Sequence, residues 1–256
     1  MSSGFYLGNG TRQGSLLSPY LFARYIRDLI SNVVDSGVGC KIADQILNIL
    51  AYADDLVLLA PSWNAIQSLL SILHAQATYI DMTINIQKTV AMVFTPSRRS
   101  MIVSHTFPPL KIGDHCIRYV EQFKYLGHIV TDSLTDDEDI NREIKNMFVR
   151  TNILLRKYKF CSVEVKTILF RSFCLCMYDI GLWKVYNKGT LNRFRSCYHK
   201  CLKIFFGYRR TDSVTDMLFT LKLPSFDSIL HNGKQQFVLS VLRSGNNLID
   251  TVRVLF

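Results

Sequence analysis

Two adjacent aspartates, Asp54 and Asp55, are the residues of this sequence with the clearest chemical potential. They follow Tyr52 and separate two apolar, β-prone runs, so residues 47–60 predict a hairpin with carboxylates at its bend. Like charges this close repel, and a divalent cation relieves the repulsion. Oxygen-only ligands suit Mg²⁺, and a pair of such ions can align the attacking and leaving oxygens in phosphoryl transfer. Taken alone, however, an Asp-Asp pair is more often a solvated turn.

Helices on both sides of this hairpin are predicted to supply its packing surface. Ser18-Pro19 indicates an N-cap followed by proline at the first helical position, and apolar residues then recur at helical spacing as far as Val33. Ser62 is predicted to cap a second helix. The apolar face of that helix consists of Ile66, Leu69, Leu70, Leu73, Ala77 and Ile80.

Short strands, and then helices, are predicted for the rest of the chain. Residues 89–94, 117–120 and 123–130 are apolar and β-prone, whereas 96–100 indicate a loop. Thr135 and Glu138 have the spacing of a capping box for a third helix. Beyond about residue 163 the sequence favours helix as far as 254. The predicted fold class is α+β. The apolar stripe of the third helix is Ile140, Ile144, Met147, Thr151 and Leu154.

The net charge of +10 is concentrated in one part of the chain. Residues 138–210 hold 16 basic and 5 acidic side chains, an excess of 11 positive charges, whereas residues 1–137 are close to neutral. A positive field of this kind favours a polyanion through phosphate contacts and counterion release. The alternative interpretation is a solvated helical surface rich in lysine and arginine.

The chain is expected to be an intracellular protein of the nucleus or cytoplasm, not a secreted one. Its start lacks a basic segment followed by an apolar run, and Arg171 and Asp179 interrupt its most apolar stretch, so no signal peptide or membrane span is predicted. Seven cysteines are thinly spread and odd in number, which favours free thiols. Cys197 and Cys201 do not have the spacing of a common zinc site and are expected to be buried.

Four motifs in a fixed order give the sequence a family resemblance. Gly10–Pro19 (GTRQGSLLSP) precedes Tyr52–Asp55 (YADD), and Ile84–Thr89 and Phe123–Gly127 (FKYLG) follow it. Across residues 8–130 their order and spacing resemble reverse transcriptases, and look most like the LINE-type enzymes of non-LTR retrotransposons. The resemblance implies a partial right-hand polymerase palm, an antiparallel sheet with packed helices, over residues 1–134. A mostly helical thumb and C-terminal extension would follow over 135–256.

The resemblance implies roles for the residues around the Asp-Asp pair. Asp54 would be a catalytic metal ligand and Asp55 a second, weaker one in a two-metal Mg²⁺ site, with Tyr52 beside the primer terminus. Arg12, Gln13 and Gly14 match the family's loop at the nucleotide and template, where glycine lets the backbone approach closely. An ordinary turn entering the first helix is the alternative for this loop.

Lys88 matches a lysine near the leaving pyrophosphate, where an ammonium can donate a proton or neutralise charge. A surface lysine after a turn is the alternative. Asp81 and Met82 stand where many relatives have glycine, so the turn before Lys88 is expected to differ from theirs.

A primer grip is implied by the FKYLG motif. Phe123, Tyr125, Leu126 and Gly127 resemble a hairpin in which aromatic packing and a glycine turn hold the primer end. Core packing is the alternative explanation for the aromatic residues. The basic helical region that follows would grip the template–primer duplex without reading its sequence.

One metal ligand of the family has no counterpart in this sequence. The family's palm begins with a strand bearing another aspartate upstream of Gln13-Gly14, and nothing before Gly8 matches that strand. Asp28 and Asp35 fall on or just after the first predicted helix and are interpreted as surface charges. The family's basic fingers region is absent too. Because one carboxylate is missing, the isolated chain is predicted to be inactive.

The sequence thus predicts a fragment of an RNA-directed DNA polymerase, a nucleotidyltransferase that joins deoxynucleoside triphosphates to a DNA primer on an RNA template. The missing N-terminal part of the polymerase would be a partner of this chain. The alternative is a non-catalytic RNA- or DNA-binding remnant, or adopted protein, that keeps the basic helical surface.

Overall fold

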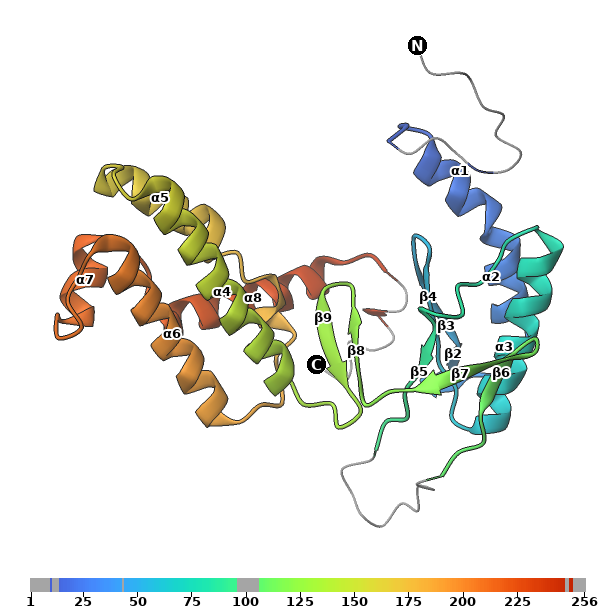
Figure 1. Ribbon diagram of the computed structural model, residues 1–256. Coiled ribbons are helices and arrows are strands. Elements are labelled where there is room, and N and C mark those ends of the chain that lie inside the picture. Colours follow the sequence, from blue (N-terminus) through green and yellow to red (C-terminus); the bar gives the residue numbers. More distant parts are fainter. Residues whose placement is uncertain (1–9, 11–13, 43, 96–105, 247–248, 251–256) are drawn as a thin grey trace. The chain divides into compact units, whose positions relative to one another are not determined.

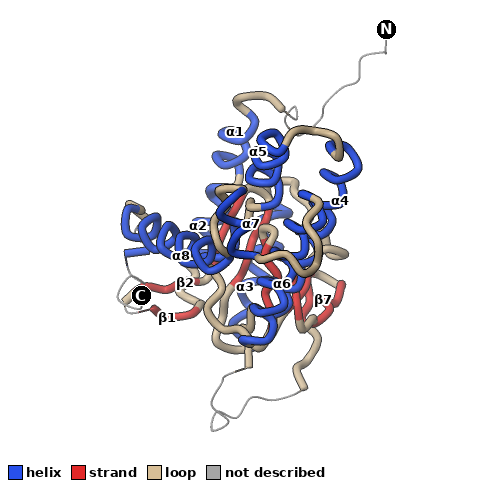
Figure 2. The backbone as a smooth tube through the Cα atoms, turned by 90° about the vertical axis from the view of Figure 1, so that its left-hand side faces the viewer, coloured by secondary structure: helices blue, strands red, loops and turns tan. Residues whose placement is uncertain are grey.

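The computed structural model describes residues 10, 14–42, 44–95, 106–246 and 249–250 (Figure 1). Its helices and short strands confirm the predicted α+β class (Figure 2). The chain divides into two compact units. The first draws on the described residues of Met1–Ala91, Ser104–Tyr119 and Asp250–Phe256, and the second on those of Met92–Val103 and Val120–Ile249.

The first unit combines three helices with small sheets. Its elements are α1 (Ser18–Tyr25), α2 (Arg27–Val34), β1 (Cys40–Ile42), β2 (Gln45–Leu47), β3 (Ile49–Tyr52), β4 (Asp55–Leu58), α3 (Trp63–Tyr79), β5 (Val90–Ala91), β6 (Leu110–Ile112) and β7 (His115–Tyr119). One core cluster joins α2, β3 and α3 through Leu29, Val33, Ile49, Leu69, Leu73 and Ala77. The predicted apolar face of α3 therefore does form the core beneath the hairpin.

The described strands form four small sheets rather than the single antiparallel sheet implied by the resemblance. β1–β2, β3–β4 and β8–β9 are antiparallel pairs, and β5, β7 and β6 form a three-stranded sheet in that order. β5 runs parallel to β7, since the chain passes through β6 before it returns beside β5. Parallel pairing requires such a crossover connection.

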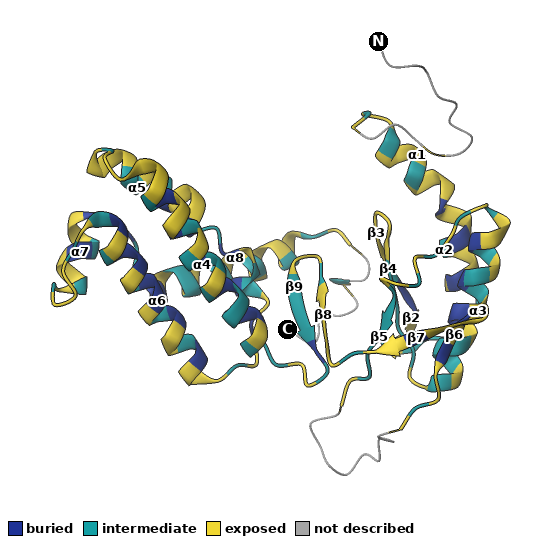
Figure 3. Ribbon diagram, viewed as in Figure 1, coloured by how far each residue is buried: buried dark blue, intermediate teal, exposed yellow. Residues whose placement is uncertain are grey.

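The first predicted helix is wrong in two details. Ser18 is the first helical residue rather than the cap, Leu17 holds the N-cap position, and no side chain caps the helix. The helix also breaks at Ile26 into α1 and α2. α1 contains no buried residue whereas α2 buries two, because only α2 packs into the core (Figure 3). Helical periodicity continues across the break and therefore does not reveal it.

The second unit is mainly helical. Its elements are β8 (Gln122–Tyr125), β9 (His128–Thr131), α4 (Asp137–Tyr158), α5 (Val163–Cys174), the 3-10 helix η1 (Tyr178–Gly181), α6 (Lys188–Phe206), α7 (Val214–Thr220) and α8 (Phe226–Arg243). Aromatic residues dominate its core: Phe170, Trp183, Phe194, Tyr198, Phe205 and Phe226. The predicted stripe of α4 faces this core, with Ile140, Met147, Thr151 and Leu154 buried and Ile144 half-buried. The loop predicted at 96–100 lies outside the described residues.

The helix caps divide into one confirmed prediction and one wrong one. Ser62 caps α3 by accepting a hydrogen bond from the backbone N–H of Ala65. The predicted capping box of α4 does not form, since the helix has Asp136 at its N-cap and no side-chain cap. The Asp136 carboxylate instead accepts from the backbone N–H groups of Lys184 and Val185, at 2.7 and 2.8 Å. The side chain at the observed N-cap position, Asp136, is thus engaged in a tertiary contact instead of a cap.

Candidate functional site

The Asp-Asp pair lies at the tip of the β3–β4 hairpin, as predicted. Tyr52 pairs with Asp55 as the last rung of the ladder, so Ala53 and Asp54 form a two-residue turn. Ala53 has a φ of +52°, in the left-handed region. Tight two-residue hairpin turns commonly need such a residue. The turn therefore presents Tyr52, Asp54 and Asp55 together at one end of the hairpin.

Asn48, a residue that the sequence reasoning did not select, anchors the base of this hairpin. The side chain is only 2% exposed, and its amide donates to the carbonyl oxygens of Val33 at 2.7 Å and Val38 at 2.9 Å. The backbone carbonyl of Asn48 accepts a hydrogen bond from the backbone N–H of Leu59. A buried polar group without partners costs about 1–3 kcal/mol, so these bonds fix the hairpin to the end of α2.

The carboxylates at the tip are exposed and unpaired. Tyr52 is 63% exposed, and Asp54 and Asp55 are both exposed. In the described part of the chain, neither carboxylate makes an ion pair or a side-chain hydrogen bond. Two adjacent anions with oxygen donors and no internal counter-charge fit a hard divalent cation such as Mg²⁺. Asp54 and Asp55 are therefore the residues that could hold such an ion.

Only part of the predicted nucleotide loop can be placed. Gly14 lies in an exposed turn before α1, whereas Arg12 and Gln13 lie outside the described residues. The φ of Gly14 is +79°, which favours glycine, and among the described residues, its chain neighbours aside, no heavy atom lies within 4 Å of the position that a Cβ would take. Its backbone is consequently open to approach.

Lys88 projects from a turn that Asn85 organises. The backbone N–H of Lys88 donates to the carbonyl and side-chain oxygens of Asn85, both at 3.2 Å, and the Lys88 side chain is exposed. Upstream, Asp81 has a φ of +55°, and the N–H of Met82 donates to Ala77. This is the left-handed helix ending that glycine usually makes. Asp81 thus adopts the left-handed conformation that glycine usually takes at a helix end.

The FKYLG motif forms the β8–β9 hairpin in the second unit. Phe123 pairs with Val130 and Tyr125 with His128, so Leu126 and Gly127 make the turn. Both have a positive φ, +47° and +96°, which explains the need for glycine there. Leu126 is 51% exposed and Phe123 is 39% exposed. The aromatic residues are therefore only partly accounted for by core packing.

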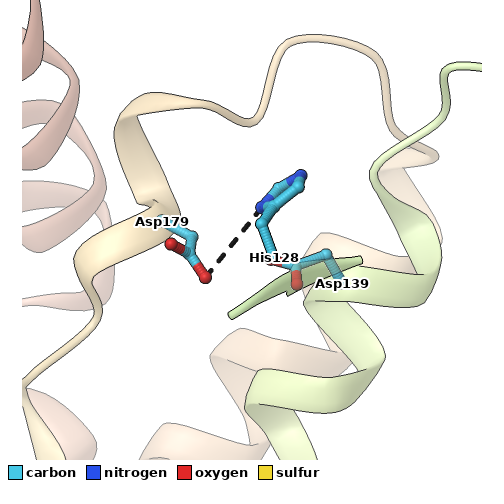
Figure 4. Close-up of side chains that lie close together, drawn as sticks. All are labelled: His128, Asp139 and Asp179. Atoms are coloured by element: carbon cyan, nitrogen blue, oxygen red, sulfur yellow. Dashed lines mark ion pairs between the residues drawn. The ribbon is translucent and has the colours of Figure 1, made fainter. Parts of the chain in front are cut away.

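A cluster of charged side chains at the start of α4 escaped the sequence reasoning. His128, Asp139 and Asp179 converge from β9, α4 and η1 (Figure 4). The carboxylate of Asp139, which is fully buried, accepts from Arg142 Nε at 2.7 Å, Trp183 Nε1 at 2.9 Å and the N–H of Ile129 at 2.9 Å. Arg142 also pairs with Asp179. These residues are far apart in the sequence, and no short motif connects them.

Arg142 supplies one positive charge to the two carboxylates of this cluster. Burial opposes ionisation of Asp139, but the close contact with His128 and the hydrogen bonds from Arg142 and Trp183 outweigh it and hold the pKa of Asp139 well below its usual range. The contact with Asp139 in turn raises the pKa of His128. With its carboxylates paired, the cluster is a structural junction rather than a second metal site.

The remaining predictions concern cysteines and membranes. Cys197 and Cys201 are buried in α6, as expected, and among the described residues they join no group that could hold a metal. Burial raises the pKa of the nearby Cys174 to about 11. Within the described ranges, no helix has the length and apolar character needed to cross a bilayer.

Comparisons with known proteins agree with the four motifs. Residues 1–130 match the family described as reverse transcriptase (RNA-dependent DNA polymerase). The RNA-directed DNA polymerase from mobile element jockey of Drosophila funebris is 25% identical over 237 residues, which cover 87% of this chain and 24% of that protein. The Pol polyprotein of the type-2 retrotransposable element R2DM of Drosophila melanogaster is 30% identical over 136 residues, 49% of this chain and 12% of that protein.

A third relative is the Pol polyprotein of the type-1 retrotransposable element R2 of Popillia japonica. It is 28% identical over 123 residues, 46% of this chain and 17% of its own length. The matched segments thus span less than a quarter of each of these three relatives.

Proposed function

The chain belongs to the reverse transcriptase family, among those of non-LTR retrotransposons, and we propose on that premise that it is the metal-binding and primer-holding part of an RNA-directed DNA polymerase. The observation that carries the proposal is the exposed turn with Tyr52, Asp54 and Asp55 at the tip of an anchored hairpin. Its two carboxylates lack partners among the described residues, so they are available to a ligand.

Asp54 and Asp55 hold Mg²⁺ in this proposal, with Asp54 the stronger ligand. When bound, divalent cations neutralise the triphosphate and activate the primer's 3′-hydroxyl. The protein's own contribution is to fix the two carboxylates on a rigid hairpin, through Asn48 and the core beneath it. Tyr52, exposed on the same turn, contacts the primer terminus.

The residues around the hairpin bind the deoxynucleoside triphosphate and the RNA template. Arg12, Gln13 and Gly14 form the nucleotide and template loop, and the open backbone at Gly14 supports close approach of a ligand. Lys88 neutralises the departing pyrophosphate or donates a proton to it. Its exposed position on the turn held by Asn85 supports this role.

The primer grip is the β8–β9 hairpin, with Phe123 and Tyr125 on β8 and Leu126 and Gly127 in its turn. We assign residues 1–134 to the palm and 135–256 to the thumb and its extension. The exposed apolar side chains of Phe123 and Leu126 on the β8–β9 hairpin support contact with a sugar or base. The charge excess of residues 138–210 supports contact with the phosphates of the DNA primer and RNA template.

The 256-residue chain alone is inactive in this proposal. No third carboxylate joins Asp54 and Asp55 in the described part of the chain, and the family's other metal-bridging aspartate has no match in this sequence. Primer extension with Mg²⁺ should therefore be undetectable for the chain alone. It should appear when the upstream fingers and palm segment of the jockey relative is joined before residue 1.

In that joined polypeptide Asp54→Asn should abolish extension, whereas Asp28→Asn, an exposed aspartate on α2, should leave it unchanged. Robust extension by the chain alone would refute the proposal that its metal site is incomplete. Extension that survives Asp54→Asn would refute the role of Asp54 as a metal ligand. The second candidate, a non-catalytic nucleic-acid-binding protein, is favoured by the charge excess of residues 138–210. It is supported if the joined polypeptide stays inactive while the chain binds a primer–template duplex in a salt-dependent way.

A further inference from the structure

The β8–β9 hairpin packs against the start of α4, which orients it. Within the described residues it is an isolated two-stranded sheet. Such a hairpin is marginally stable on its own and takes its orientation from the elements it packs against. Its strand β9 lies against the start of α4, where Asp139 accepts a hydrogen bond from the backbone N–H of Ile129 at 2.9 Å.

His128 makes the second contact between the hairpin and α4. It is the first residue after Gly127, and it pairs with Tyr125 across the turn. Its Nδ1 lies 3.1 Å from Asp139 Oδ2 and 3.9 Å from Asp179 Oδ2, and its Nε2 lies 3.8 Å from Asp136 Oδ1. The imidazole therefore faces three carboxylates.

Among the described residues, the Arg142 guanidinium contacts two of these carboxylates, Asp139 and Asp179. It lies between Asp139 and Asp179, and also pairs with Glu143. Three carboxylates facing one imidazole, with one guanidinium beside them, leave a net negative surrounding for His128. An imidazolium is attracted to that site, and a neutral imidazole loses most of the attraction.

The junction is rigid on the α4 side. Asp139 is bound by Trp183, Arg142 and Ile129, and Asp136 by the backbone of Lys184 and Val185. The carboxylates are thus fixed whether or not His128 is charged. Only the imidazole, on the hairpin side, changes its charge near neutral pH.

We propose that Asp139 and protonated His128 form a clamp that positions the tip of the β8–β9 hairpin, so that His128 is a positioning residue whose protonation tunes the hold on a primer end. The part of this statement that concerns the primer rests on the proposed function. The clamp itself is a property of the second unit alone. Loss of the His128 proton weakens the contact nearest the turn, while Asp139 still holds β9 through the backbone N–H of the next residue, Ile129.

Histidine-detected NMR of the whole chain tests the clamp without any assay of activity. The imidazole of His128 and the backbone amides of Leu126 and Gly127 should titrate with one shared midpoint. His128→Gln should abolish the titration of the two amides, whereas His199→Gln, on α6 of the same unit, should leave it intact. Tip amides that do not follow His128, or that still titrate in His128→Gln, would overturn the clamp.

A binding measurement then tests the effect on a primer. At fixed ionic strength, the dissociation constant for a primer–template duplex should rise about fivefold between pH 6 and pH 8.5, a size typical of one partly exposed ion pair. The His128→Gln variant should lack this dependence, and His199→Gln should keep it. An unchanged pH dependence in His128→Gln would overturn the positioning role.

The NMR titration and the binding measurement distinguish a failure of the clamp from a failure of the proposed nucleic-acid function. If the chain binds no duplex at low salt, the proposed nucleic-acid function fails, and the NMR titration still decides the clamp. Circular dichroism of both variants checks that each is folded. His128 is partly exposed and Asp139 keeps its other partners, so His128→Gln preserves the fold better than a change at Asp139 would.

Discussion

The two hairpins with proposed roles differ in how the carboxylates beside them are satisfied. At the tip of β3–β4, Asp54 and Asp55 are exposed and lack partners among the described residues. Beside β8–β9, Asp139 is fully buried and accepts from three donors while it faces His128. Unpaired carboxylates are available for an external cation, whereas paired ones connect segments of the fold. The contrast predicts opposite outcomes for mutations that look alike in the sequence.

The largest expected effect concerns activity. In the joined polypeptide, Asp54→Asn should lower primer extension by at least about 10³-fold and Asp55→Asn by about 10²-fold, since each removes part of the metal charge balance. Both variants should keep the free energy of unfolding within about 0.5 kcal/mol, because exposed and unpaired groups contribute little to it. Steady-state extension rates and urea denaturation measure the two quantities. A loss of more than about 2 kcal/mol would mean that these carboxylates are structural after all.

The next effect concerns Asp139, for which we expect a loss of stability, in contrast to Asp54 and Asp55. Asp139→Asn should lower the free energy of unfolding of the second unit by about 3 kcal/mol, because it removes the charge of a fully buried carboxylate that pairs with Arg142. Urea denaturation followed by the fluorescence of Trp183, whose indole donates to Asp139, reports this loss directly. Glu138→Gln, on the same helix but exposed, is the matched control and should be neutral. A neutral result for Asp139→Asn would contradict the structural reading of the cluster.

A smaller effect compares the two helix starts. Ser62→Ala should destabilise the first unit by about 1 kcal/mol, because Ser62 accepts a hydrogen bond from Ala65. Glu138→Ala should change stability by less than about 0.5 kcal/mol, since the capping box to which it would belong does not form. Thermal and urea denaturation measure both. Equal losses would show that Glu138 has a capping role in solution.

The smallest effect is a pH dependence of stability. The pKa of His128 is raised in the folded chain, mainly by Asp139, above its unfolded value of about 6.5. Its stabilising contribution is therefore complete below about pH 6.5 and is lost as the pH rises through the folded-state pKa. Stability of the second unit should decline over that window, and His128→Gln should flatten the decline. A slope unchanged in His128→Gln would mean that another group is responsible.

His199 provides an internal contrast for this measurement. Burial lowers the pKa of His199, so its proton disfavours the folded state, and its effect falls in the pH range below about 6.5. Because the two windows lie on opposite sides of the unfolded pKa, His199→Gln should change the acidic limb only. The two histidines can thus be separated in one titration series.

Local patterns predicted a good part of the fold. The hairpin with carboxylates at its bend, the Ser62 cap and the buried stripes of α3 and α4 all follow from spacing within a few turns or strands. Predictions went wrong where distant segments compete for the same groups. Asp136, at the N-cap of α4, binds the backbone of Lys184 and Val185, and the first predicted helix divides into α1, which buries no residue, and α2, which buries two.

The sequence by itself determined the family and the residues proposed for chemistry, because four short motifs keep their order and each depends mainly on neighbouring residues. The tertiary structure alone decided which acidic groups are unpaired. Neighbouring residues in the sequence do not indicate that Asp54 is unpaired and Asp139 paired. In the folded chain, the carboxylate of Asp139 accepts a hydrogen bond from Trp183, 44 residues further along the chain, in the core. Pairing of this kind depends on long-range packing, which no local pattern records.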